Sequence, residues 1–247
     1  MNRDSIYFAS DFHLGSSDLK SNHTREKKIL DWLDKIKKNA SELYLLGDVF
    51  DFWYEYKKVV PKGFVRFLSK LSEMSENGIK IHIIVGNHDL WMKNYLTDEC
   101  GIQIHHQYLM IKKQGKNLYL DHGDNLDPKN YYFKFIKLIF RNPLCQWLFN
   151  KIHPNISFQI AHSWSKASRK NGTTPPYMGS DNEKQEIFCR NHFKTNPKIN
   201  FYILGHRHLP LDIEIGKTCR YINTGDWITH NSYAILKDGE IQLENFS

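Results

Sequence analysis

The sequence predicts one α/β domain with a largely parallel sheet and an insertion in its second half. Short apolar runs alternate with stretches of helical periodicity across residues 6–89, which is the order typical of β–α–β units. Five apolar runs end at glycine, aspartate or histidine, as expected where strands open onto a ligand site. A length of 247 residues suffices for one large core plus an insertion.

The composition indicates which partners suit the chain and in which cellular compartment we expect it. The chain has 34 Lys and Arg against 27 Asp and Glu, a net charge of +7 and a pI near 9.0, which suits phosphate, nucleic acid or an acidic membrane surface. The apolar run near the N-terminus is too short for a signal peptide, and no run is long enough to span a membrane. We therefore expect a cytoplasmic chain that begins at Met1. Four cysteines without CxxC spacing indicate free thiols in a reducing compartment: Cys100, Cys145, Cys189 and Cys219.

The first predicted strand, Ile6–Ala9, is followed by an Asp-x-His pair. Asp11 and His13 are two residues apart, so in an extended segment their side chains project to the same side and can reach one metal ion. A carboxylate oxygen with a neutral imidazole suits Mn, Fe or Zn better than Ca. Taken alone, the pair fits a surface turn equally well.

An amphipathic helix over Thr24–Asn39 leads to the central strand, Leu43–Leu46. This strand ends at Gly47 and Asp48, where glycine permits a tight turn that directs the carboxylate into the crevice at the strand ends. A turn with only a local Asp hydrogen bond is the alternative. Asp51, three residues after Asp48, is expected to orient one of the metal ligands without binding the metal itself.

A second helix around Phe64–Leu71, with an Asn-Gly pair as its stop, leads to the buried strand Ile81–Val85. Gly-Asn-His-Asp follows. The side-chain carbonyl of Asn87 can bind a metal. His88 titrates near neutrality and can stabilise or protonate a leaving oxygen; an ordinary hydrogen-bonded histidine is the alternative.

Two further strand ends have histidines. Residues 108–121 predict a β-hairpin whose second strand ends at His122. A last apolar strand, residues 201–204, is followed by glycine and then by His206 and His208, which can point two imidazoles into one cavity. Arg207, the residue between these two histidines, is expected to face away from the cavity as a surface charge.

Seven potential metal ligands therefore follow five strands. They exceed the needs of one ion, so the sequence predicts two ions that share Asp48, about 3.5–4 Å apart, the usual arrangement for in-line displacement at phosphorus. The seven donors are Asp11, His13, Asp48, Asn87, His122, His206 and His208.

In order and spacing, these motifs resemble those of the calcineurin-like metallophosphoesterases, over about residues 6–230. The resemblance implies a four-layer α/β/β/α sandwich with two divalent ions at the strand ends, usually Mn²⁺ with Fe, Zn or Mg as alternatives. It also implies that water or hydroxide between the ions attacks phosphorus, with Asp48 and His88 in catalytic roles and Asp51, Asp89 and Asp124 behind the ligands. The first ion would be held by Asp11, His13, Asp48 and His208. The second would be held by Asp48, Asn87, His122 and His206.

The predicted insertion, residues 126–178 of the single 1–247 domain, should decide the substrate. Its first part, Tyr131–Ile152, is rich in aromatic residues, with basic residues on one helical face and Pro143 before a second short helix, residues 144–152. Such helices often only pack on their domain. A basic amphipathic helix pair also suits an anionic membrane surface or a chamber for acyl chains, and the Ser-, Lys- and Arg-rich segment at 163–170 can hold phosphate or sugar.

A five-motif core with such a helical lid resembles the UDP-2,3-diacylglucosamine pyrophosphatases of lipid A biosynthesis, as do Phe50–Trp53 and His122–Leu126. The resemblance implies hydrolysis of UDP-2,3-diacylglucosamine at the phosphorus nearest uridine, giving UMP and 2,3-diacylglucosamine 1-phosphate, at the cytoplasmic face of the bacterial inner membrane. Many members have Arg at the position of His88. The implied substrate contacts are Asn87, His88, Asn130, Tyr131, Tyr132, Trp164, Ser165, Lys166, Ser168, Arg169 and Lys170.

Two other functions compete with this interpretation. A phosphodiesterase or nuclease would use the same chemistry on nucleotides or nucleic acid, and the net charge fits it. The hydrophobic lid argues against nucleic acid, whose grooves need basic and aromatic residues along a track. A non-catalytic protein-binding scaffold is the second alternative, but such a chain would be expected to have lost ligands. We therefore expect neither a nucleic acid nor a protein partner.

Overall fold

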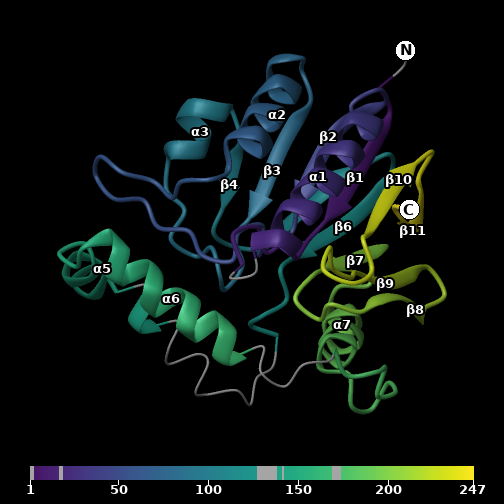
Figure 1. The fold of residues 1–247 in the computed structure, drawn as a ribbon. Helices are drawn as coiled ribbons and strands as arrows, with labels where there is room; N and C mark the ends of the chain where they lie inside the picture. Colours follow the sequence, from purple (N-terminus) through teal and green to yellow (C-terminus); the bar gives the residue numbers. More distant parts are fainter. Residues whose placement is uncertain (1–2, 17–18, 127–137, 141, 169–173) are drawn as a thin grey trace.

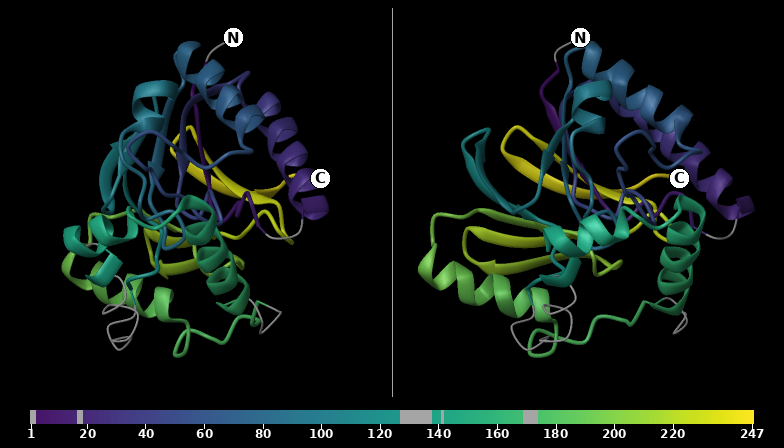
Figure 2. Two further views of the ribbon diagram at one scale, coloured as in Figure 1. Left: turned by 60° about the vertical axis from the view of Figure 1, so that its left-hand side comes forward. Right: turned by 90° about the vertical axis from the view of Figure 1, so that its left-hand side faces the viewer.

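Two β-sheets lie face to face between layers of helices in the computed structural model, which describes residues 3–16, 19–126, 138–140, 142–168 and 174–247 (Figure 1). The first sheet has the strand order β11-β10-β1-β2-β3-β4 and the second has the order β5-β6-β7-β9-β8. Figure 2 shows the two sheets stacked, with helices outside them. Among the described residues, no helix has the length and apolar character needed to cross a membrane.

The first sheet contains the parallel strands predicted at the start of the chain. β1 pairs in parallel with β2, β2 with β3 and β3 with β4, whereas β10 joins β1 antiparallel and β11 joins β10 antiparallel. Its strands are β1 (Ser5–Ala9), β2 (Ala40–Leu45), β3 (Lys80–Ile84), β4 (Gln103–His105), β10 (Ser232–Lys237) and β11 (Glu240–Asn245).

The second sheet begins with the predicted hairpin. Gln114 and Gly115 have φ of +47° and +78°, so the turn is a two-residue one that matches strand twist. The sequence predicts strands at 108–113 and 118–121, which would leave a four-residue turn, but Lys113 pairs directly with Lys116. β6, β7 and β9 run parallel, with β5 and β8 antiparallel at the edges. The strands are β5 (Leu109–Lys113), β6 (Lys116–Asp121), β7 (Phe201–Leu204), β8 (Pro210–Gly216) and β9 (Cys219–Thr224).

Three groups of buried side chains separate the layers. Phe8, Ile84 and Ile203 belong to the group between the two sheets. The group outside the first sheet includes side chains of α1 (Leu19–Ile36), α2 (Val65–Glu76) and α3 (Tyr95–Cys100). A third group lies between the second sheet and α7 (Lys184–Thr195). The α/β/β/α sandwich is therefore confirmed.

Boundaries differ modestly from the predictions. α1 begins five residues before the expected Thr24 and ends three before Asn39, because a helix that covers a sheet need not begin where its apolar stripe begins. In the insertion, α5 (Pro143–Phe149) overlaps the predicted helix 144–152, and α6 (Pro154–Ser168) follows it. The basic residues assigned to the first insertion helix, Lys134, Lys137 and Arg141, lie outside the described residues.

Candidate metal centre

The loops that follow β1, β2, β3, β6 and β7 bring all seven donors together. Ligand atoms of Asp11, His13, Asp48 and His208 lie within 4.8 Å of one another, as do those of Asp48, His122 and His206. The side-chain oxygen Oδ1 of Asn87 lies 3.2 Å from Nε2 of His122. Asp48 belongs to both groups, which is the arrangement predicted for two ions. This edge of the molecule is the one toward which β3 points in Figure 1.

The two central carboxylates are each held on one side and open on the other. Oδ2 of Asp11 accepts the backbone N–H of His206 at 2.9 Å, and Oδ1 of Asp48 accepts that of His88 at 3.0 Å. The other oxygen of each faces imidazole nitrogen. Asp11 Oδ1 lies 3.1 Å from His208 Nε2 and accepts no hydrogen bond, and Asp48 Oδ2 lies 3.4 Å from His122 Nε2.

Three histidines are oriented in one way, with Nε2 toward the carboxylates and Nδ1 toward an oxygen behind the ring. The Nδ1 of His122 donates to Leu46 O at 2.7 Å, which fixes the tautomer and turns the free nitrogen to an ion. His13 Nδ1 lies 3.5 Å from Asp51 Oδ1 without a hydrogen bond, and His208 Nδ1 lies 3.4 Å from Asp226 Oδ2. The ring nitrogens Nε2 of His13 and His208 are 3.2 Å apart. Open carboxylate oxygens and converging nitrogens fit a pair of divalent cations.

Five of the seven donors have left-handed backbone conformations. Their φ values are +56° for Asp11, +45° for His13, +52° for Asp48, +67° for His206 and +56° for His208. Non-glycine residues adopt this region at a cost, so the surroundings must enforce it. Two backbone hydrogen bonds do so between the first two loops, from Asp11 N to Gly47 O at 3.0 Å and from His13 N to Asp48 O at 2.9 Å.

A glycine allows the third loop to approach the bridging carboxylate. A Cβ at Gly86 would lie 2.2 Å from Oδ1 of Asp48, so only glycine permits this separation. Asp89, in the same loop, has an entirely buried carboxyl whose oxygens accept Gly86 N at 2.7 Å and Val49 N at 2.8 Å. Asp89 therefore ties the loop after β3 to the loop after β2.

The electrostatics follow from burying acids among imidazoles. Burial raises the pKa of Asp48, but the His122 and His88 rings outweigh it and leave that pKa well below its usual range. Burial lowers the pKa of His206 to about 4, which keeps this ring neutral and its nitrogen lone pair available. Burial, and to a smaller extent the negative charge of Asp48, raises the pKa of the Asp89 carboxyl to about 7.

The three aspartates predicted to support the ligands, Asp51, Asp89 and Asp124, all lie near the site, but each makes different contacts. Asp51 faces His13, as described above, and is 2% exposed. Asp89 braces two loops. Asp124 is 9% exposed, and its carboxylate acts on His122, where burial lowers the pKa but acids led by Asp48 raise it well above its usual value.

Two residues that support the site, Asp226 and Arg25, were not predicted from the sequence. Asp226 faces Nδ1 of His208 and also accepts the backbone N–H groups of Thr229 and His230 at 2.9 and 3.0 Å. It follows β9 in a Gly-Asp pair, the signal that identified Asp48, so the sequence offered a means to find it. Arg25 donates to the carbonyl oxygens of Phe12 and His13 at 3.1 and 2.8 Å from helix α1, and no motif in the sequence points to it.

His88 lies at the rim of the site. Its Nδ1 is 3.0 Å from the carbonyl oxygen of Asp51, and its Nε2 is 4.0 Å from Oδ2 of Asp48. Burial lowers the pKa of His88, so the ring is neutral at pH 7. With its proton on Nδ1, donated to that carbonyl, Nε2 faces the donors as an acceptor.

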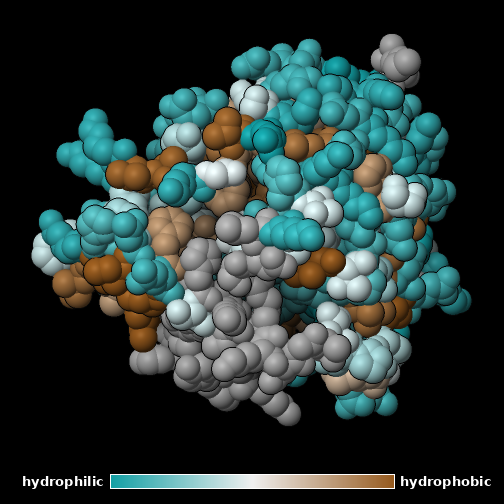
Figure 3. Space-filling view, viewed as in Figure 1, coloured by the Kyte–Doolittle hydropathy of each residue, from teal (hydrophilic) through white to brown (hydrophobic). Residues whose placement is uncertain are grey.

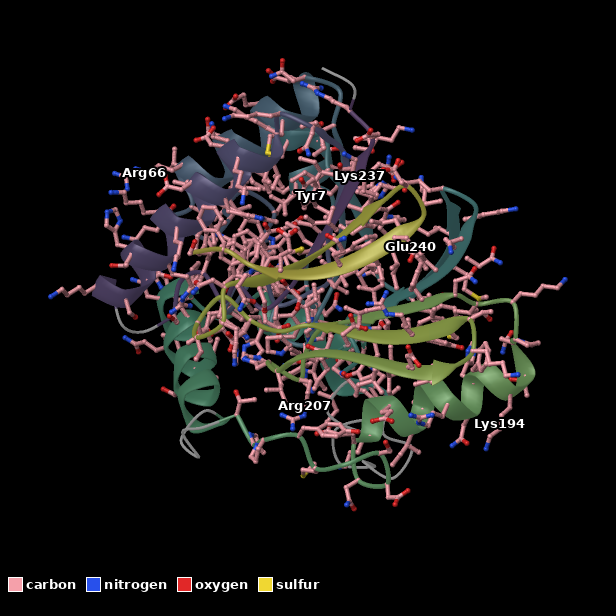
Figure 4. The ribbon with its side chains drawn as sticks, turned by 90° about the vertical axis from the view of Figure 1, so that its right-hand side faces the viewer. Tyr7, Arg66, Lys194, Arg207, Lys237 and Glu240 are labelled. Atoms are coloured by element: carbon pink, nitrogen blue, oxygen red, sulfur yellow. The ribbon has the colours of Figure 1, made fainter. Side chains whose placement is uncertain are left out.

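Arg207 is not the plain surface charge that the sequence predicts. It forms an ion pair at 2.8 Å with the buried carboxylate of Glu183, and Figure 4 shows it between the second sheet and the segment that leads into α7. It also donates to the carbonyl oxygens of Pro175 and Pro176 at 2.9 and 3.0 Å. The arginine between the two histidines therefore fixes the chain that enters α7, an interaction across 24 residues that no local pattern signals.

Aromatic side chains beside the site hold α5. The hydroxyl of Tyr54 donates to Gln146 O at 3.1 Å, and Nε1 of Trp91 donates to Phe140 O at 2.7 Å. The ring of Phe149 packs at 4.8 Å from Tyr54 and 4.6 Å from Trp91, centroid to centroid. These contacts hold α5 against the loops that follow β2 and β3.

The predicted substrate contacts in the insertion are only partly placed. Trp164, Ser165, Lys166 and Ser168 lie on α6, but their side chains are outside the described part of the structure. Asn130, Tyr131, Tyr132, Arg169 and Lys170 are outside it altogether. Asn87 and His88 are described, and both lie at the metal-candidate groups.

Known proteins similar to this chain match it over most of its length. The model of the calcineurin-like phosphoesterases matches residues 5–210. A UDP-2,3-diacylglucosamine hydrolase from Porphyromonas gingivalis is 38% identical over 98% of each chain, and one from Actinobacillus succinogenes is 26% identical over 90% of this chain and 91% of its own. A solved phosphoesterase from E. coli aligns over 98% of this chain and all of its own at 15% identity, with a TM-score of 0.45. On the family model and the 38% match, the chain belongs to the calcineurin-like phosphoesterases and, within them, to the family of the UDP-2,3-diacylglucosamine hydrolases.

Proposed function

We propose that this chain hydrolyses the pyrophosphate bond of UDP-2,3-diacylglucosamine, giving UMP and 2,3-diacylglucosamine 1-phosphate in lipid A biosynthesis. The observation that supports this best is the convergence of seven ligand-type side chains in a chain that is 38% identical, over nearly its whole length, to a relative named for this substrate. A scaffold protein would have no need to keep all seven donors.

The two groups around Asp48 are the proposed sites of two divalent ions. Together the ions would supply an activated nucleophile and neutralise charge on the phosphate. Carboxylate and imidazole ligands favour Mn²⁺, which we propose, with Fe, Zn and Mg as alternatives that metal analysis distinguishes. The first ion would be held by Asp11, His13, Asp48 and His208. The second would be held by Asp48, Asn87, His122 and His206.

His88 is proposed to contact the phosphate that is cleaved. The neutral ring has no proton on Nε2 while Nδ1 donates to the carbonyl of Asp51. A phosphate that binds beside the ring would raise the imidazole pKa through its negative charge. His88 would then donate to a phosphate oxygen, and through it to the departing group. This proposal gives histidine the phosphate contact that arginine would make in other members.

The helices α5 and α6 present an apolar surface suited to the acyl chains or to the membrane that contains them. Figure 3 shows hydrophobic side chains gathered over α5. On α5, Leu144, Trp147 and Leu148 are 63, 56 and 53% exposed, and on α6 Ile156 and Ile160 are about half exposed. Nζ of Lys151 lies 5.2 Å from the ring centre of Trp147. Apolar side chains beside cations bind anionic bilayer surfaces.

We therefore propose that the protein is cytoplasmic and binds peripherally to the inner membrane. The other predicted insertion contacts, Trp164, Ser165, Lys166, Ser168, Arg169 and Lys170 with Asn130, Tyr131 and Tyr132, are proposed for the sugar and the second phosphate. Vesicle co-sedimentation tests the membrane part. Trp147→Ser with Leu148→Ser should release the protein from anionic vesicles, whereas the exposed but distant Val65→Ser should not. Equal binding by all three proteins would refute the proposed surface.

One assay tests the proposed reaction. Purified protein with Mn²⁺ and UDP-2,3-diacylglucosamine should release UMP, and the same protein should leave a single-stranded oligonucleotide intact. Reaction in ¹⁸O-labelled water should place the label in UMP, because attack is proposed at the phosphorus nearest uridine. Cleavage of the oligonucleotide without UMP release would favour the nuclease alternative. No hydrolysis of any phosphoester, with Mn²⁺ bound, would favour the scaffold.

A further inference from the structure

One buried amide connects two of the loops that hold the donors. His122 and Gly123 follow β6, and Gly205 and His206 follow β7. Gln185, in the first turn of α7, lies behind both loops and is 6% exposed. It is more than 60 residues in sequence from the first loop and 20 from the second, with its side-chain amide between them.

The amide of Gln185 has a partner for each of its hydrogen-bonding positions. Its Nε2 donates to Gly205 O at 3.0 Å and to Gly123 O at 3.3 Å. Its Oε1 accepts the hydroxyl of Tyr221 at 2.7 Å and Nδ2 of Asn223 at 2.9 Å. Two donors and two acceptors are the full capacity of a glutamine amide. The bonds fix its orientation, since an exchange of nitrogen and oxygen would set the amide oxygen against both carbonyls and the amide nitrogen against Nδ2 of Asn223.

Steric fit supports the same conclusion. Gly123 has φ of +98°, and a Cβ there would lie 2.2 Å from Nε2 of Gln185. Glycine is therefore needed both for the backbone conformation and for the approach of the amide. Asn223, which donates to Gln185, also donates to Gly205 O at 2.7 Å, so the loop after β7 is held twice.

We propose that Gln185 is a positioning residue for the metal centre: by binding the two peptide carbonyls next to His122 and His206, it sets the separation of these two imidazoles. Gly123 directly follows the first histidine and Gly205 directly precedes the second. Asp48 completes the group, and its carboxylate is placed independently by the first sheet. The hydrogen bonds of the Gln185 side chain go to Gly123, Gly205, Tyr221 and Asn223, and to none of the seven donor side chains. The inference rests on the proposed two-ion centre.

Mn²⁺ binding to the metal-free protein tests the proposal. Wild-type protein should bind two ions, measured from the EPR signal of free Mn²⁺. Gln185→Met keeps the length of the side chain but removes its four hydrogen bonds. The variant should bind one ion with unchanged affinity and the ion at Asp48, His122 and His206 about tenfold or more weakly, which is the usual effect of removing support behind metal ligands. Hydrolysis should return at higher Mn²⁺ with the KM for substrate unchanged. Two ions bound at wild-type affinity would overturn the proposal.

Two further variants separate positioning from general destabilisation. Glu186→Gln alters the adjacent residue, which is fully buried and bonded to Tyr177 and Arg190 away from the donors. It should lower the melting temperature but leave Mn²⁺ binding unchanged; equal weakening in both variants would refute the specific role. Tyr221→Phe removes one bond to Gln185 with little change in volume and should weaken the same ion less. It provides the test if Gln185→Met does not fold. A wild-type protein that binds no Mn²⁺ would instead refute the proposed metal centre.

Discussion

The loops at the strand ends and the helices α5 and α6 differ in how they are held. The loops interlock through backbone and carboxylate hydrogen bonds, and Asp11, His13, Asp48 and His122 are at most 1% exposed. The α5 helix has no buried residue of its own and is fixed mainly by aromatic contacts on one side, while Trp147 and its neighbours remain exposed.

This difference matches the role proposed for each region. Phosphoryl chemistry needs ligands held to fractions of an ångström, so strained backbone is worth its cost there. Acyl chains need apolar area and little directional bonding, so loosely held helices suffice. We therefore expect changes in the loops to affect hydrolysis of every substrate, and changes in α5 and α6 to affect only the acylated one.

The largest effect is expected at the carboxylate shared by both groups. Asp48→Asn keeps the size but loses the charge, so turnover should fall by at least about 10³-fold even at saturating Mn²⁺. Asp238→Asn is a matched control, since Asp238 has the same φ of +52° in an exposed turn. Release of UMP measures both. An Asp48→Asn enzyme near wild-type activity would contradict the shared-ligand arrangement.

Removal of α5 and α6 should affect hydrolysis of the acylated sugar nucleotide much more than hydrolysis of a small phosphodiester. With residues 142–168 replaced by a Gly-Ser linker, hydrolysis of a small chromogenic phosphodiester should stay within about twofold. Hydrolysis of the acylated sugar nucleotide should fall by about 100-fold or more, because each lost apolar contact contributes about 1.5–3 kcal/mol when buried. Both rates are measured on protein that still binds two Mn²⁺. Equal loss of both rates would mean that the helices are only structural.

Asp89 offers a smaller effect that concerns stability of the loops. Asp89→Ala leaves the N–H groups of Gly86 and Val49 buried without their acceptor, so the free energy of unfolding should fall by about 2–4 kcal/mol. Urea unfolding measures it. Asp98→Ala, on the exposed side of α3, should change stability by less than about 0.5 kcal/mol. If the two variants were equally stable, the loops would not depend on this carboxyl.

The smallest effect concerns His82, which lies on β3 outside both regions. Burial lowers the pKa of His82 from its usual 6.5 to about 4, and its ring stacks on Tyr44 at 4.4 Å. A pKa lowered by folding gives stability that is fully present above about pH 6.5 and is lost as pH falls toward 4, by up to about 1.4 kcal/mol per pH unit. His82→Phe keeps the stacking and removes the titration, so its loss of stability between pH 7 and pH 5 should be smaller than that of the wild type. Identical losses would exclude His82 as a cause.

Much of this architecture was readable because its signals are local. Apolar runs followed by Asp-x-His, Gly-Asp, Gly-Asn-His, His-Gly-Asp or Gly-His-x-His identified five strands and seven donors, and all seven lie together. The strand β4, the strands from β8 to β11 and the helices α3, α6 and α7 were not predicted. β8 alternates between half-buried and exposed positions, so it lacks the continuous apolar run by which the central strands were recognised.

By itself, the sequence determined the fold class, the family and the seven candidate donors, since these depend on residue types at fixed spacing. Only the tertiary structure decided how the donors are supported, because those contacts join distant segments: Asp226 behind His208, Arg207 with Glu183, and Gln185 between the loops after β6 and β7. A glutamine in an amphipathic helix looks like a surface residue in a sequence. Its role exists only where two peptide carbonyls from other parts of the chain meet its amide.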